Sequence, residues 1–257
     1  MIVQSDERSM IMVIPTYNEI DNIASIVGRL RDAVPASDVL IVDDNSPDGT
    51  GKLAEELASG DSQIHVLHRT DKAGLGAAYL AGFDWAMAQG YDVIGEMDAD
   101  GSHLPEQLPR LVEALDSADL VIGSRYVRGG AIENWSKKRE AISRAGNIYV
   151  RMLLGMPVRD ATAGYRLFRR ETLERIDLSK VESQGYVFQA DLAFRTWDAE
   201  MRVREVPITF VERIHGESKM TSDVAKESLR RITRWGLRER RRQFQVLIGK
   251  QPARRRR

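Results

Sequence analysis

Short apolar runs alternate with longer amphipathic stretches along the first half of the chain. Each run has at most five residues and ends at a polar turn, which is the pattern of a buried strand. The runs occupy residues 10–14, 39–42, 64–67, 93–97 and 120–123. The stretches between them predict helices at about 21–33, 51–58, 72–88 and 105–115. This alternation indicates an α/β fold with a mostly parallel sheet covered by helices on both faces.

The alternation is weaker after residue 125. Apolar runs at 165–168 and 203–211 predict two more strands, and Pro207 places the second at a sheet edge, because proline donates no backbone hydrogen bond. Loops are predicted around 132–135, 157–164 and 213–220. Helices are predicted at 139–154, from about 185 to 197, and from about 222 into the C-terminal end.

Composition excludes several classes of protein. The chain has 257 residues and no cysteine, so disulfides, thiolate zinc sites and cysteine nucleophiles are ruled out. Residues 1–9 are polar and do not resemble a signal peptide. No apolar run approaches the ~18 residues of a membrane-spanning helix. We therefore expect an ordinary globular protein, with one domain at 1–240 and a basic tail at 241–257.

Positive charge gathers at the C-terminal end, although 38 basic residues balance 38 acidic ones. Arginines from Arg230 to Arg257 there face one acidic residue, Glu239, and alternate with apolar residues such as Trp235, Leu237 and Phe244. This composition is typical of an interfacial helix on anionic lipid, or of docking to a membrane partner. A disordered, solvated end is the alternative for residues 254–257. Nucleic-acid binding is a remote alternative, because the body has no aromatic-basic motif.

Two carboxylates, Asp98 and Asp100, follow the fourth predicted strand. Alternate residues of a strand face one side, so both can point to the same place if the strand geometry persists to Asp100. Such oxygen ligands suit Mg²⁺ or Mn²⁺, which in turn can hold a diphosphate. The alternative is a simple turn, in which Asp, Gly and Ser are common.

Other polar clusters also follow predicted strands, where parallel sheets bind ligands. They occupy 15–19, 43–50 and Arg125. The first strand lacks a dinucleotide-binding glycine fingerprint, and no Walker A sequence occurs. Gly74 and Gly76 follow a different strand, where we expect them to aid helix packing. A bound nucleotide would therefore be held through a metal and side chains.

Five motifs occur in one order along the chain: Pro-Thr-Tyr-Asn-Glu at 15–19, Asp-Asp-Asn-Ser-Pro-Asp-Gly-Thr at 43–50, Met-Asp-Ala-Asp at 97–100, Gly-Ser-Arg-Tyr at 123–126 and His-Gly-Glu-Ser-Lys at 215–219. Together they resemble the family 2 inverting glycosyltransferases of GT-A fold. Within these, they resemble the dolichol- or polyprenol-phosphate mannosyltransferases that lack C-terminal membrane helices. The resemblance extends from about Met10 to Arg240.

The resemblance implies a GT-A fold with an acceptor-side region of helices and loops and a C-terminal amphipathic basic helix. It implies transfer of mannose from GDP-mannose to a polyprenyl phosphate, with inversion, at the cytoplasmic face of a membrane, directly or through an integral membrane partner. UDP-glucose is the alternative donor. Nucleoside contacts would come from Pro15, Tyr17, Glu19, Val42 and Asp44. Asp98, Ala99 and Asp100 would hold the metal and diphosphate, Arg125 and Arg139 would face phosphate or sugar, and Arg213 and Lys219 would close over the diphosphate.

One position departs from the family pattern. Many relatives carry a glutamine two residues beyond the second metal aspartate, whereas this chain has Ser102. We expect Ser102 to contact the metal weakly or through water, with His103 as a neighbour that could compensate. For the lipid chain, Trp135, Ile142, Tyr149, Leu153 and Leu154 are candidates for an apolar lip, with core packing as the alternative.

Overall fold

The computed structural model describes residues 8–71, 74–181, 186–212 and 222–247. Its centre is a seven-stranded sheet in the order β3-β2-β1-β4-β7-β5-β8. β7 is antiparallel to both neighbours and the other pairs are parallel, which confirms the mostly parallel sheet. β8 lies at the edge, as Pro207 predicts. The strands are β1 (Met10–Thr16), β2 (Ser37–Asp43), β3 (Ile64–His68), β4 (Val93–Glu96), β5 (Leu120–Ser124), β7 (Arg166–Arg169) and β8 (Val203–Pro207).

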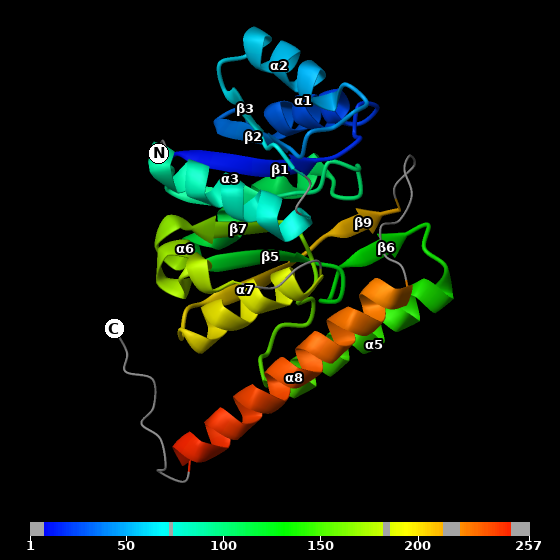
Figure 1. Ribbon diagram of the computed structural model, residues 1–257, viewed down its shortest axis with the longest axis vertical. Coiled ribbons are helices and arrows are strands. Elements are labelled where there is room, and N and C mark those ends of the chain that lie inside the picture. Colours follow the sequence, from blue (N-terminus) through cyan, green and yellow to red (C-terminus); the bar gives the residue numbers. More distant parts are fainter. Residues whose placement is uncertain (1–7, 72–73, 182–185, 213–221, 248–257) are drawn as a thin grey trace.

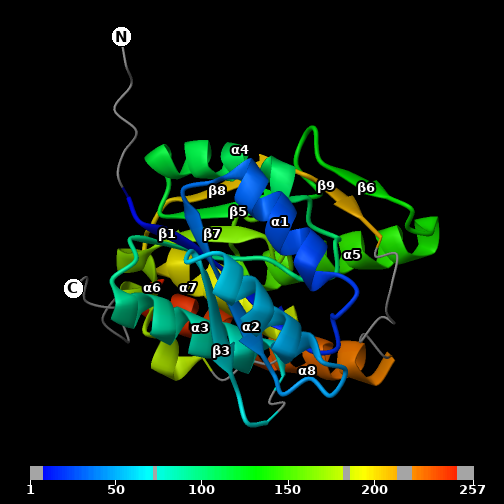
Figure 2. The same ribbon diagram turned by 90° about the horizontal axis from the view of Figure 1, so that it is seen from above.

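Helices cover both faces of this sheet (Figures 1 and 2). α1 (Ile23–Ala33), α2 (Thr50–Gly60) and α4 (Leu108–Ala114) lie on one face. α3 (Leu75–Gln89), α6 (Arg170–Ile176) and α7 (Tyr186–Asp198) lie on the other. Short 3₁₀ turns occupy Pro105–Gln107, Leu115–Ser117 and Leu178–Lys180. Apart from α6, which the apolar pattern did not indicate, these helices match the predicted ones.

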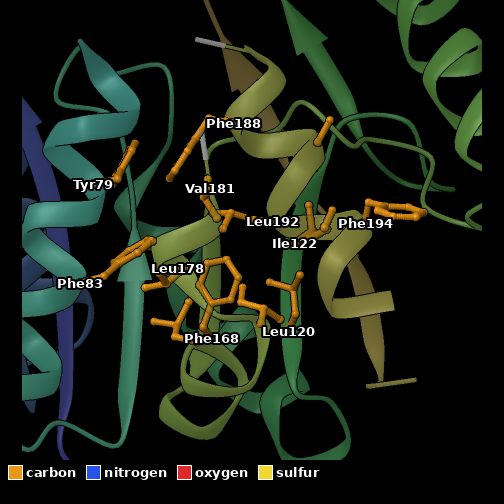
Figure 3. Packing of buried hydrophobic residues seen from close by; sticks show 14 of the residues in the cluster. Tyr79, Phe83, Leu120, Ile122, Phe168, Leu178, Val181, Phe188, Leu192 and Phe194 are labelled. Carbon is orange, nitrogen blue, oxygen red and sulfur yellow. The ribbon is translucent and has the colours of Figure 1, made fainter. Parts of the chain in front are cut away.

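Two hydrophobic cores result, one on each face of the sheet. In β1, Met12 and Ile14 belong to the core under α1, whereas Ile11 and Val13 belong to the core under α3. Alternate residues of a strand point to opposite faces, so a strand buried on both faces must be apolar throughout. Figure 3 shows the core under α3, where Phe83 packs edge-on against Phe168 of β7.

A second, two-stranded sheet corrects two predictions. The run 203–211 is two strands, because the chain leaves the main sheet after Pro207 and residues Thr209–Val211 form β9. β9 pairs in parallel with β6 (Ala131–Glu133), which overlaps the start of the predicted loop around 132–135. The connection is closed by backbone hydrogen bonds from Ile208 to Ser124 and from Ala131 to Ile208, so this small sheet continues the end of β5.

The remaining helices, α5 (Lys137–Leu154) and α8 (Ser222–Leu247), lie side by side at the periphery (Figure 1). Tyr149 is hydrogen-bonded to Thr233 at 2.7 Å, and a Cβ placed on Gly236 would meet Leu153. Contacts advance along both helices together, so the helices are parallel. α8 continues unbroken through the predicted boundary at 240/241, and residues 248–257 lie outside the described part. Among the described residues, no helix is both long and apolar enough to span a bilayer.

Candidate functional site

Hydrogen bonds join the loops that follow β1 and β2 at their carboxyl ends. The Thr16 hydroxyl donates to Asp43 Oδ1 at 3.1 Å, and the Ser46 backbone N–H and hydroxyl donate to the same carboxylate. The backbone N–H of Asn18 donates to Ser46 Oγ, and that of Ile20 donates to Asp48. The first two predicted motifs therefore form one unit, in which Asp43 and Asp48 serve as internal acceptors.

The predicted nucleoside residues gather on this unit. Pro15 pairs with Val42 in the β1–β2 register, and Tyr17 and Glu19 are half-buried on the following loop. Asp44 is buried and accepts a hydrogen bond from the Arg69 guanidinium, a partner that the sequence did not reveal. The Val42 side chain is fully buried toward α3, which leaves the backbone of this residue for the predicted nucleoside contact.

Asp98 and Asp100 are positioned by a turn and not by strand geometry, because β4 ends at Glu96. The Tyr79 hydroxyl donates to Asp98 Oδ1 at 3.1 Å, and the Asp98 backbone N–H donates to His103 Nδ1 at 3.3 Å. The Ser102 backbone N–H donates to Asp100 Oδ1 at 3.0 Å. The chain bends at residues 99–101, so strand geometry does not persist to Asp100, and Asp98 is additionally held in place from α3.

Behind these carboxylates lies a layer of buried polar groups. Burial, followed by the charge of Asp98, raises the pKa of Tyr79 well above its usual value, so its hydroxyl remains a donor. Burial raises the pKa of Glu96 to about 7 against the opposing charge of Arg166, and Gln189 donates to this carboxyl at 3.0 Å. Burial lowers the pKa of His103 to about 4, so its ring is neutral near pH 7 and Nδ1 can accept.

The carboxylates at this edge of the sheet fit a cation whose remaining ligands are supplied by the substrate. Among the described residues, no group of three His, Cys, Asp or Glu side chains could hold a metal alone. Magnesium sites commonly use one or two carboxylates together with substrate phosphates and water. Asp98 and Asp100 supply that number. Ala99 lies between these two residues and Ser102 follows them, and both are buried. The Ser102 backbone N–H donates to Asp100.

The two predicted phosphate-facing arginines each contact a carboxylate. Arg125 is buried and donates to both oxygens of Asp160, from Nε at 2.8 Å and from Nη2 at 2.7 Å. Arg139 pairs with Glu212, and its guanidinium lies 4.1 Å from the centre of a Trp135 ring. Neither carboxylate was predicted, since 35 and 73 residues separate the partners. Arg213 and Lys219 lie outside the described residues.

Comparison with known proteins gives two close relatives. The chain is 58% identical over 228 residues to "Undecaprenyl-phosphate mannosyltransferase" of Micrococcus luteus, covering 89% of this chain and 94% of that protein. It is 55% identical over 240 residues to "Polyprenol monophosphomannose synthase" of Mycolicibacterium smegmatis, covering 93% of this chain and 90% of that protein.

Solved structures share the fold at lower identity. Glucosyl-3-phosphoglycerate synthase of Mycobacterium tuberculosis, solved with Mn²⁺ and UDP, has a TM-score of 0.62 at 21% identity, covering 88% of this chain and 77% of that one. Mannosyltransferase PcManGT of Pyrobaculum calidifontis, solved with GDP-Man and Mn²⁺, has a TM-score of 0.56 at 18% identity, covering 82% and 58%. These matches confirm the GT-A fold.

Two kinds of match assign the family: a family profile that matches the sequence and the two curated relatives. The profile described as "Glycosyl transferase family 2" matches residues 11–177, which contain the motifs at the carboxyl ends of β1, β2, β4 and β5. With both curated relatives aligned over about nine-tenths of the chain, the resemblance seen in the motifs is confirmed. The chain is a glycosyltransferase and belongs to glycosyl transferase family 2.

Proposed function

We propose that this enzyme transfers mannose from GDP-mannose to the phosphate of a polyprenyl phosphate, giving polyprenyl phosphate β-mannose and GDP with inversion. The observation that carries the proposal is the 58% and 55% identity to two proteins, one named for mannosyl transfer to undecaprenyl phosphate and one for synthesis of polyprenol monophosphomannose. The order of the strand-end motifs supports the same reaction.

The donor nucleotide would lie across the loops that follow β1 and β2. Asp44 would accept hydrogen bonds from ribose hydroxyls or from a guanine N–H, because an ionised carboxylate only accepts. Arg69 holds this carboxylate in place. Pro15, Tyr17 and Glu19 would contact the nucleoside from β1 and its loop.

The diphosphate would lie at the carboxyl end of β4. Asp98 and Asp100 would hold Mg²⁺ or Mn²⁺, which stabilises the charge that develops on the departing diphosphate. Tyr79 fixes the orientation of Asp98, and the Ser102 backbone fixes Asp100. Arg213 and Lys219 would add cationic contacts to the diphosphate.

The acceptor needs little activation. A phosphate monoester has a second pKa near ~6, so one of its oxygens is largely anionic at neutral pH. The neutral His103 is not required as a base, and its Nδ1 is occupied by the Asp98 backbone N–H. Arg139, half-exposed above Trp135 at the start of α5, would meet the acceptor phosphate. Arg125 would remain in its ion pair with Asp160, and this ion pair would hold the loops around the acceptor in place.

A transfer assay tests the proposal. Purified enzyme is given GDP-mannose or UDP-glucose with a short-chain polyprenyl phosphate, with and without Mn²⁺, and lipid-linked sugar is measured. We expect mannose transfer that requires the cation and is abolished in Asp98→Asn. Preferential transfer from UDP-glucose would contradict the proposed donor, and undiminished turnover by Asp98→Asn would contradict the metal assignment.

A further inference from the structure

Exposed large apolar side chains are concentrated on the two peripheral helices. Of the eight such residues in the described part of the chain, six lie on α5 and α8. They are Ile142, Ile148, Met152, Leu229, Leu237 and Phe244, with exposures between 50% and 69%. Single exposed apolar residues are ordinary, but a concentration of them on one layer marks an interaction surface.

The two helices present four of these residues, Ile148, Met152, Leu237 and Phe244, in the same direction. Each buries one side toward the body, through Val150 and Leu154 on α5 and through Ile232 on α8, while Trp235 packs edge-on against Phe194. At about 100° per residue, the side opposite the body carries apolar residues on both helices. Because the helices are parallel and adjacent, these positions form one surface, which we call the outer face. Its apolar residues are Ala141, Ala145, Ile148 and Met152 on α5, and Leu237 and Phe244 on α8.

Positive charge borders the outer face. α5 carries five basic residues against one acidic residue, and α8 carries eight against three, whereas the whole chain is balanced. Apolar residues with Lys and Arg at their edges are the composition of helices that lie in a lipid headgroup layer. The exposed basic side chains include Lys137, Lys138, Arg144 and Arg151 on α5, and Arg230, Arg234, Arg238 and Arg241 on α8.

The N-terminal end of the outer face leads to the candidate site. Arg139 lies over Trp135, which packs edge-on against Phe210 at 5.5 Å. Phe210 in turn packs against His103 at 5.4 Å, and His103 accepts the hydrogen bond from Asp98. A lipid phosphate held at this end of α5 would therefore lie next to the residues that surround Asp98.

We propose that the outer face docks onto the surface of an anionic lipid bilayer. Its apolar residues insert among the headgroups, and the basic residues at its edges contact lipid phosphates. Helices α5 and α8 thereby lie in the plane of the membrane, with the N-terminal end of α5 directed to the acceptor. This inference deepens the proposed function and rests on it for the choice of a lipid acceptor.

Vesicle co-sedimentation of the full chain tests the docking without donor, acceptor or metal. Vesicles are phosphatidylcholine alone, or phosphatidylcholine with phosphatidylglycerol. An apolar variant combines Ile148→Gln, Met152→Gln, Leu237→Gln and Phe244→Gln. A basic variant combines Arg234→Gln, Arg238→Gln and Arg241→Gln. The matched control changes exposed residues elsewhere, Leu75→Gln, Arg110→Gln and Arg175→Gln.

We expect wild type and control to bind only the anionic vesicles. The apolar variant should bind at least about tenfold more weakly, since each buried CH₂ contributes to partitioning. The basic variant should bind roughly a hundredfold more weakly, from about 1 kcal/mol for each lost cation. All four proteins should transfer mannose equally to a water-soluble short-chain acceptor without vesicles.

Two results would overturn the docking. One is wild-type binding by both variants, which would assign the membrane contact to another part of the chain. The other is absence of vesicle binding by wild type together with self-association that the apolar variant abolishes, measured by light scattering, which would assign the outer face to a second copy. Failure of wild type to transfer mannose to the soluble acceptor would instead contradict the proposed function, independently of sedimentation.

Discussion

The Tyr79 hydroxyl donates a hydrogen bond to Asp98 Oδ1 across 3.1 Å, from a side chain with no exposed surface. Its ring is stacked on Phe188 at 6.1 Å and on Phe83 at 6.0 Å, as Figure 3 shows for the core that they share. The orientation of the Asp98 carboxylate is therefore tied to α3 and to the rigid core beneath it.

Replacing Tyr79 with Phe should weaken metal binding while the fold is retained. Loss of a hydrogen bond to a metal-ligating carboxylate typically costs 10–100-fold in metal affinity. We expect the Mn²⁺ concentration for half-maximal turnover to rise by about tenfold or more. Tyr91→Phe is the control, because it removes a tyrosine–aspartate hydrogen bond, to Asp38, away from Asp98. An unchanged Mn²⁺ dependence in Tyr79→Phe would remove Tyr79 from the site.

The Arg125–Asp160 pair should behave as a buried ion pair. Removal of one partner leaves an uncompensated buried charge, which costs about 3–5 kcal/mol, whereas removal of both costs less. Asp160→Asn and Arg125→Met should therefore each lower the free energy of unfolding more than Arg125→Met combined with Asp160→Leu. Urea denaturation measures all three. Additive losses in the double variant would show that the two residues contribute independently.

The Asp38–Tyr91 contact should make stability depend on acid pH. Burial raises the pKa of Asp38, but hydrogen bonds from Tyr91, Gln63 and His65 outweigh it and hold the pKa below its usual value. A carboxyl with a depressed folded-state pKa stabilises the fold above its unfolded pKa of about 3.9, and this stabilisation is lost as pH falls through the folded value. Tyr91→Phe should cost about 1 kcal/mol at pH 7. In denaturation at several pH values, the cost should shrink as pH falls below the unfolded pKa of about 3.9; a constant difference would contradict this assignment.

Because α5 and α8 approach each other closely, Gly→Ala substitutions at two positions in these helices should change stability in opposite directions. A Cβ at Gly236 would lie 2.2 Å from Leu153, whereas one at Gly146 would meet nothing within 4 Å. Overpacking costs about 1–3 kcal/mol, and an unhindered Gly→Ala change within a helix gains about 0.5–1 kcal/mol. Gly236→Ala should lower the melting temperature and Gly146→Ala should raise it. Equal shifts would mean that the helices are not packed as described.

Sequence patterns predicted the sheet and its flanking helices, because burial makes apolar and polar residues repeat with a regular spacing along each strand or helix. They located the motif at Asp98 for the same reason, since polar residues must end a buried strand. They did not reveal Tyr79, Asp160 or Glu212, whose partners lie 19, 35 and 73 residues away and leave no local pattern. The division of 203–211 into two strands depends on pairing of β9 with β6, which is likewise non-local.

Mannosyl transfer to a lipid phosphate with inversion is the reaction that we propose for this enzyme. The most direct test is NMR of the product that purified enzyme forms from GDP-mannose and a short-chain polyprenyl phosphate in the presence of Mn²⁺. We predict a single mannose joined through its anomeric carbon to the lipid phosphate in the β configuration. An α-linked mannose, or no lipid-linked mannose at all, would contradict the account.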